Sequence, residues 1–230
     1  MEKTINFIIG KPGMGVVIES YAFIGVATQA DGPCAQVWLP PGYMLTGGGA
    51  YEMGGKRNNV LCASHPIRNR HGIYTGWTVA ALDPVPLAVF AIGVKAFEDG
   101  KPVEIEQHVF CATSALVPEP GVSVRLPAGW TGTGGGAQDN MAGPANGNLL
   151  TGSYPLIGPD GRISGWSASG RDPQAGHGVR VTAFVIGIRD AGGEPLDVQV
   201  ASNPSMVTRF SNGPATTRAN SERKAYNSYA

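Results

Sequence analysis

Two stretches of the sequence decide the fold: VWLPPGYMLTGGGA at residues 37–50 and VRLPAGWTGTGGGA at residues 124–137. Nine of their 14 positions are identical, and the two stretches lie 87 residues apart. Unrelated segments of this length share about one residue by chance, so the match indicates an internal repeat.

Three further pairs of segments match in the same order along the chain. The pairs are NVLCASHPI at 59–67 with NLLTGSYPL at 148–156, GWTVAALDP at 76–84 with GWSASGRDP at 165–173, and LAVFAIGVK at 87–95 with VTAFVIGIR at 181–189. The offset between partners only grows, which places the insertions in loops. A third opening segment, GEPLDVQV from residue 193, resembles GKPVEIEQ from residue 100. We therefore expect a first repeat over 16–102, a second over 103–195, and over 196–230 a partial third repeat that supplies a completing strand and a polar tail.

The repeated segments have the pattern of β-strands. Apolar and polar residues alternate in CAQVWL at 34–39 and in VSVRL at 122–126, as in half-buried strands. Short runs rich in Val, Ile, Thr and aromatic residues recur between Gly- and Pro-rich turns, and no helical period extends beyond about two turns. The sequence predicts an all-β fold of two tandem Greek-key-like units, each with about six strands, arranged as a β-sandwich or a β-prism.

The composition excludes several classes of partner. The 230 residues include 34 Gly, 18 Pro and 15% charged residues, and the positive and negative charges balance. Because no basic excess is present to neutralise phosphates, we expect no nucleic-acid partner. No apolar run reaches the roughly 18 residues of a membrane-spanning helix. We see no secretory signal at the N-terminus, so we expect a protein that is cytoplasmic, released by a non-classical route or already processed.

The three cysteines, Cys34, Cys62 and Cys111, form no CxxC pair, and none corresponds to a cysteine in the other repeat. We expect buried, unbridged thiols rather than a disulfide framework or zinc ligands. The histidines have no metal-binding spacing, and neither Ser64 nor Ser153 has a repeated histidine beside it. The sequence therefore predicts no metal, no cofactor and no catalytic residue.

Each repeat carries three consecutive glycines directly after a strand. No GK[ST] motif or helix start follows them, which argues against a phosphate-binding loop. Glycine permits a β-bulge, a positive φ or the close approach of another backbone, and it equally lets a ligand approach the main chain. Both interpretations apply to Gly47, Gly48 and Gly49 and to Gly134, Gly135 and Gly136.

Trp and Asp recur six residues apart in both repeats, as Trp77 with Asp83 and as Trp166 with Asp172. An even spacing in an extended strand puts both side chains on one face. There the ring can stack on a pyranose and the carboxylate can accept hydroxyl hydrogen bonds. The alternative is a core Trp and an Asp that starts the following Asp-Pro turn. The aromatic residues just before the glycines are candidate stacking platforms on the same grounds: Tyr43 and Trp130.

In combination, PxGxxxTGGGA, NLLTxSYP, GWxxxxxD and TAFxIGI resemble a tandem β-repeat found in bacterial surface and secreted proteins, over about residues 16–203. The resemblance implies a repeated extracellular-type β-module and supplies no catalytic residue. The first repeat departs from these motifs at Cys62 and His65, where the second has Thr151 and Tyr154. More distantly, the Gly-rich turns near an Asp on a repeated all-β frame are similar to the sugar sites of β-prism lectins.

These features favour a non-catalytic binding protein with two related sites for surface carbohydrate, because two weak sites together bind more tightly through avidity. The expected partner is a glycan or a cell-surface receptor. One alternative is a membrane-acting toxin of the insecticidal type, whose β-rich fold docks to a receptor. Another is a structural protein that pairs strands between chains and forms a homo-oligomer through the partial third repeat.

Overall fold

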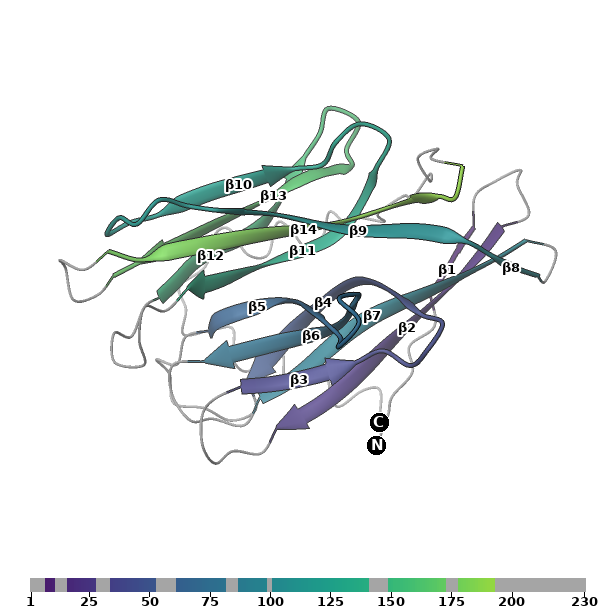
Figure 1. Ribbon diagram of the computed structural model, residues 1–230, viewed down its shortest axis with the longest axis horizontal. Helices are drawn as coiled ribbons and strands as arrows, with labels where there is room; N and C mark the ends of the chain where they lie inside the picture. The colour runs from purple at the N-terminus through teal and green to yellow at the C-terminus, as the bar shows by residue number, and fades with distance from the viewer. Residues whose placement is uncertain are drawn as a thin grey trace, which may run out of the picture. The chain divides into compact units, whose positions relative to one another are not determined.

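The computed structural model describes residues 7–10, 16–27, 34–52, 61–81, 87–98, 101–140, 149–172 and 178–192. These residues form fourteen β-strands and no helix, which confirms the all-β prediction (Figure 1). Within these ranges, no helix exists that is long and apolar enough to cross a membrane. In chain order the strands are β1 (Phe7–Gly10), β2 (Val16–Ala27), β3 (Cys34–Trp38), β4 (Met44–Glu52), β5 (Leu61–Arg68), β6 (Tyr74–Ala81), β7 (Leu87–Glu98), β8 (Lys101–Val103), β9 (Ile105–Thr113), β10 (Gly121–Arg125), β11 (Thr131–Asn140), β12 (Leu149–Ile157), β13 (Ile163–Arg171) and β14 (Arg180–Asp190).

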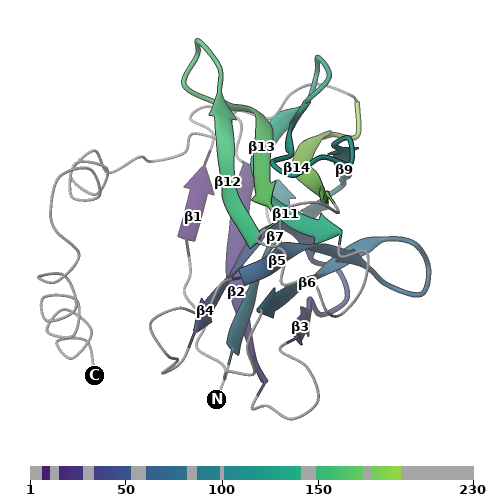
Figure 2. The same ribbon diagram turned by 90° about the vertical axis from the view of Figure 1, so that its left-hand side faces the viewer.

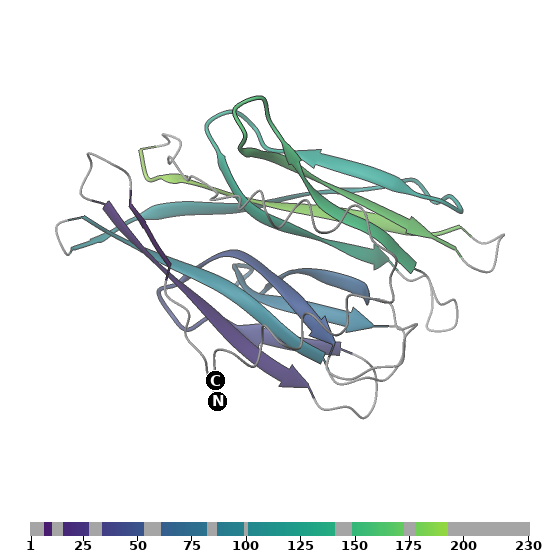
Figure 3. The ribbon, with the colours of Figure 1, turned by 180° about the vertical axis from the view of Figure 1, so that it is seen from behind.

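The strands form two antiparallel sheets. One sheet has the order β1-β2-β7-β4 with β8 beside β7, and its long strands β2 and β7 run side by side (Figure 3). The other has the order β10-β13-β11-β5-β6-β3, with β12 on β13, β14 on β11 and β9 on β14. We call β2 to β7 the first half and β9 to β14 the second half. The first half is divided between the two sheets, whereas the second half lies wholly in one.

The two halves pair their strands in the same register. Val37 pairs with Trp77 between β3 and β6, and Val124 pairs with Trp166 between β10 and β13. A register shift just before the first glycine of the triplet also occurs in both β4 and β11. Residues that match between the two sequence segments therefore also occupy equivalent positions in the hydrogen-bonded strand pairs. The Greek-key units, their arrangement as a sandwich or prism, and the repeat boundaries stay predictions.

The main hydrophobic core contains residues from both halves. Leu45 and Trp77 of the first half pack in one cluster with Phe184 and Ile186 of the second. A separate cluster around Val181 fills the second half. Because burial of apolar surface is the dominant stabilising term in folding, the first cluster holds the two halves together.

The glycine triplets lie inside strands β4 and β11. None of the six has the positive φ that the sequence allowed as one alternative. The register shifts before Gly47 and Gly134 match the β-bulge that it allowed as another. Other groups also approach several of these glycines closely. A Cβ on Gly48 would lie within 3.0 Å of the Trp77 ring, and a Cβ on Gly136 would lie within 3.0 Å of the Ser64 carbonyl oxygen. The described positive-φ glycines are Gly42, Gly72, Gly129, Gly161 and Gly178.

The cysteines only partly follow the expectation. Cys62 is buried, but Cys34 and Cys111 are exposed, and no disulfide forms among the three. The expectation of three buried thiols was wrong for these two because they occupy outward-facing positions of β3 and β9, where exposure alternates along the strand. Asp83 and the partial third repeat at 196–230 lie outside the described residues.

Candidate functional site

Trp77 lies in the shared core and is only 1% exposed. Its indole N–H donates a hydrogen bond of 3.0 Å to Ser64 Oγ on the neighbouring strand. The ring packs against Gly48, where any side chain would collide with it. Because neither face of this ring is open to solvent, the core-Trp interpretation fits Trp77 and the sugar-stacking interpretation does not.

Trp166 repeats this arrangement with more exposure. Its indole N–H donates a hydrogen bond of 2.9 Å to Ser153 Oγ, and the ring packs against Gly135. The ring is half-buried, and Ser153 is exposed. The duplicated Trp–Ser hydrogen bond therefore fastens β6 to β5 and β13 to β12, and it accounts for both tryptophans without a ligand.

Asp172 is buried, with 5% of its surface exposed. One carboxylate oxygen accepts a hydrogen bond of 3.2 Å from the N–H of Gly178, and the Asp172 N–H donates one of 2.8 Å to the Pro118 carbonyl. The bond to Gly178 joins residues six apart in the chain, so the buried carboxylate holds the chain that leads into β14 and is not presented to solvent. The Asp-Pro turn that the sequence predicts runs into residues 173–177, which lie outside the described residues.

Tyr43 and Trp130 each lie under a cationic side chain. Lys95 Nζ lies 4.1 Å from the centre of the Tyr43 ring, and Arg189 Cζ lies 4.4 Å from the centre of the Trp130 ring. Both distances fall within the range of cation–π attraction. The two pairs occupy corresponding positions in the two halves, and both rings are half-buried. Of the aromatic residues that the sequence singled out, Tyr43 and Trp130 are the ones that lie at the surface beside a charged group.

Arg189 and Trp130 belong to a larger surface group, which we call the Trp130 cluster. Phe110 meets the Trp130 ring edge to face at 5.4 Å, and the His108 ring lies 6.0 Å away. The Arg189 guanidinium is fixed by Glu106, whose carboxylate lies 2.6 Å from its Nε and 2.5 Å from a terminal nitrogen. An ion pair with two such contacts holds the cation in place over the ring.

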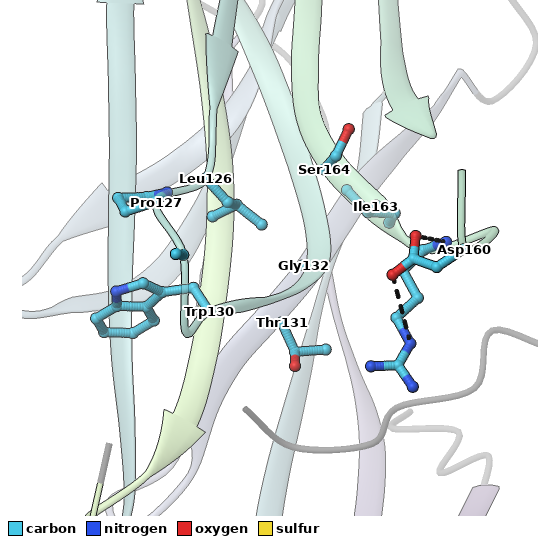
Figure 4. A pocket seen from close by; sticks show the side chains of 10 residues that line it. Leu126, Pro127, Trp130, Thr131, Gly132, Asp160, Ile163 and Ser164 are labelled. Atoms are coloured by element: carbon cyan, nitrogen blue, oxygen red, sulfur yellow. Dashed lines mark hydrogen bonds and ion pairs between the residues drawn. The ribbon is translucent and has the colours of Figure 1, made fainter. Parts of the chain in front are cut away.

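A hollow of about 310 Å³ lies next to Trp130 (Figure 4). Figure 4 shows Asp160 at one end and Trp130 at the other, with Thr131 between them. Asp160 is 3.9 Å from the Arg162 guanidinium, and both side chains are substantially exposed. The complete lining is Leu126, Pro127, Ala128, Trp130, Thr131, Gly132, Asp160, Arg162, Ile163 and Ser164.

The first half has a smaller hollow of about 250 Å³ beside its own PxG turn. Gly42, Met44 and Lys95 line it, together with residues of β7 and β8. Lys95 is the cation that lies over Tyr43. Each half therefore combines a hollow, an aromatic residue and a cation near the same turn, but only the second-half hollow has a carboxylate in its lining.

Three titratable groups lie where the halves meet. Burial raises the pKa of Asp139 to about 6, and neither of its carboxylate oxygens has a hydrogen-bond partner among the described residues. Burial, and secondarily the charge of Asp139, raises the pKa of the Cys62 thiol. Burial lowers the pKa of His65, although a hydrogen bond to the Pro66 carbonyl opposes this. These groups face the interior of the protein and do not line the hollow beside Trp130.

The sequence-predicted residues separate into two groups. The glycines, Trp77, Trp166 and Asp172 pack the fold, whereas Tyr43 and Trp130 reach the surface. Sequence reasoning missed Lys95, Arg189, Asp160 and Arg162, although the cations occupy matching positions in IGVK and IGIR. Within the described residues, no three His, Cys, Asp or Glu side chains gather as a metal site would require. No protein-family model matches the chain, and no curated protein matches it.

Proposed function

We propose that this protein is a non-catalytic carbohydrate-binding protein and that its principal site is the hollow beside Trp130. The observation that carries the proposal is the meeting of an aromatic residue, a carboxylate and a guanidinium around one hollow. Ligand pockets typically combine apolar walls with a few polar groups that fix the ligand's orientation. This set of residues matches the two kinds of surface that a pyranose presents.

The apolar side of a sugar ring would pack on Leu126, Ile163 and the part of Trp130 that borders the hollow. Its hydroxyls would reach Asp160 and Arg162 at the other end. Aspartate accepts hydrogen bonds and arginine donates several in a fixed plane, so the pair can bind adjacent hydroxyls that both donate and accept. Both side chains already have solvent-exposed surface before binding, and their partial exposure lowers the desolvation cost.

The affinity of a single site should be low. A hexose has roughly 12 non-hydrogen atoms, and about 0.3 kcal/mol for each predicts a Kd on the order of 1 mM. The Tyr43–Lys95 region in the first half offers a related surface. Two such sites engaging one displayed glycan would raise the overall affinity through the high effective concentration of the second contact.

Binding to multivalent immobilised glycans tests the proposal. We expect wild-type protein to bind, and Trp130→Ala and Arg162→Ala each to weaken binding about tenfold, which corresponds to about 1.4 kcal/mol. The matched control is Trp38→Ala, which removes a tryptophan that is 44% exposed on β3 and lines neither hollow. Circular dichroism establishes that each variant is folded.

Two outcomes would contradict the proposal. One is the absence of wild-type binding to every glycan in the multivalent format. The other is an equal loss in Trp38→Ala and Trp130→Ala, because a general surface effect would then explain the binding.

A further inference from the structure

The strand pairing between the two halves is one-sided, although both halves also pack in a shared core. The edge of β5 in the first half pairs with β11 in the second, with Ser64 opposite Ala137 and Ala63 opposite Gln138. No pairing between the corresponding strands β12 and β4 occurs in the described part of the chain. An interface that joins two different surfaces leaves one copy of each surface unused at the ends of the assembly.

Three features allow β5 to approach β11. Gly136 has no side chain, which leaves room for the Ser64 carbonyl oxygen, within 3.0 Å of where a Cβ would lie. His65 stacks on Phe184 with ring centres 4.9 Å apart and planes 12° apart. The register ends before Pro66, which has no N–H to donate.

β12 has the same features as β5, but no described strand pairs with its corresponding edge. Ser153, Tyr154 and Pro155 correspond to Ser64, His65 and Pro66 at an offset of 89 residues. Among the described strands β12 pairs only with β13 (Figure 2). Tyr154 is 52% exposed, and the sequence of β12, LLTGSYPLI, carries no charge. Exposed edges are usually protected by charged residues, so this edge is suited to pairing.

β4 offers the complementary surface. Gly49 and Ala50 correspond to Gly136 and Ala137, and Phe90 corresponds to Phe184. Within the described part, β4 pairs only with β7. The Phe90 ring lies over Gly49, with its tip within 3.0 Å of where a Cβ would lie. On Gly136, the equivalent space is occupied by the Ser64 carbonyl of β5.

We propose that a second copy of this chain pairs its β12 with β4 and that copies associate head to tail through the same strand pairing that joins β5 to β11. The register places Ser153 of one copy opposite Ala50 of the next. Phe90 rotates away from Gly49 and stacks with Tyr154, as Phe184 stacks with His65. A head-to-tail contact forms a ring where its rotation closes and an open chain where it does not.

Cross-linking between chains that each carry one engineered cysteine tests the register. In a background with Cys34→Ser and Cys111→Ser, which leaves only the buried Cys62, one batch carries Ala50→Cys and the other Ser153→Cys. Directly opposed strand residues lie within disulfide reach. The mixed batches should therefore form cross-linked dimers at least tenfold faster than the control mixture of Ile73→Cys with Ser153→Cys. Ile73 is 56% exposed in the turn between β5 and β6.

The design also separates contacts between chains from contacts within one chain. Each chain carries a single introduced thiol, so a disulfide between the thiols introduced at positions 50 and 153 has to join two chains. Equal cross-linking in the two mixtures would overturn the proposal. So would cross-links that form mainly between identical variants.

Sedimentation of the full chain gives the second measurement. The mass of the sedimenting species should rise with protein concentration for wild type and for Ile73→Glu, because the β12 edge is the same in both. Tyr154→Glu should keep the mass of one chain, because it places a charge on that edge. A single-chain wild-type mass at every concentration would overturn the proposal.

Discussion

The hairpins β5–β6 and β12–β13 have the same internal register but different surroundings. β5 lies against β11 of the other half, and Trp77 beside it is 1% exposed. β12 pairs only with β13 within the described part of the chain, and Trp166 and Tyr154 keep exposed surface. The comparison teaches that a residue's position in its half sets its pairing within the hairpin, whereas the neighbouring half decides whether the residue becomes core or surface.

Substitution of Trp77 and of Trp166 should give the largest difference in stability between the two hairpins. Trp77→Ala should lower the free energy of unfolding by about 4 kcal/mol, because it empties a large buried volume. Trp166→Ala, at the half-buried position, should cost about 1 to 2 kcal/mol. Urea denaturation of both variants measures the difference. Equal losses would show that the two hairpins are equally packed and would break the comparison.

The third glycine of each triplet gives a smaller effect. Gly136→Ala should cost about 3 kcal/mol, because the new methyl meets the main chain of Ser64 and His65, which cannot move independently. Gly49→Ala should cost under about 1 kcal/mol, since its methyl meets the Phe90 ring, which can rotate. Thermal unfolding of the pair measures the contrast. A larger loss for Gly49→Ala would contradict the assignment of Phe90 as a movable cover.

Asp139 should make the free energy of unfolding depend on pH. Its pKa is about 6 in the folded protein and near 3.8 when unperturbed, so the folded state holds the proton more tightly. The associated stability is complete below about pH 4 and is lost as pH rises through 6. The total loss by pH 7 should be between about 2 and 3 kcal/mol. Asp139→Asn should remove this decline.

His65 acts in the opposite direction, so the prediction is read from the difference between two proteins. The pKa of His65 is lowered in the folded state, and its stabilising effect is therefore lost as pH falls through the unfolded histidine pKa. This contribution is shared by wild type and Asp139→Asn. Urea unfolding at several values between about pH 4 and about pH 7.5 should show the stabilities of the two proteins diverging as the pH rises, because only wild type has a buried carboxyl at position 139 to ionise. Parallel curves would contradict the assignment.

Local pattern was enough to predict the strands. The alternation around Val37 and Val124 predicted half-buried strands, and both residues lie in paired strands. Even the shift before each glycine triplet follows the sequence offset. These features depend on neighbours a few residues away or on a hairpin partner. Such local contacts are reflected in sequence patterns that occur in both halves of the chain.

Contacts between the halves could not be predicted in this way. The sequence around Gly136 does not indicate that β5 lies against this glycine. The sequence around His65 likewise does not indicate that its ring stacks on Phe184, which lies far along the chain. The candidate site had the same difficulty, because Asp160 comes to Trp130 only through the pairing of β11 and β13. Trp77 was misleading because an amphipathic side chain can serve equally in a core or at a binding surface.

The most direct test of the proposed function is the indole N–H NMR signal of each of the four tryptophans during titration with soluble sugars. Assignment by single Trp→Phe variants distinguishes Trp38, Trp77, Trp130 and Trp166. The titrant is a soluble form of a sugar that binds the protein in the immobilised-glycan experiment. Its concentration reaches tens of millimolar, well above the expected Kd on the order of 1 mM. We predict that it shifts the Trp130 signal and leaves the signal of the buried Trp77 unchanged. A shift of Trp77 or Trp38 with Trp130 unaffected would contradict the account.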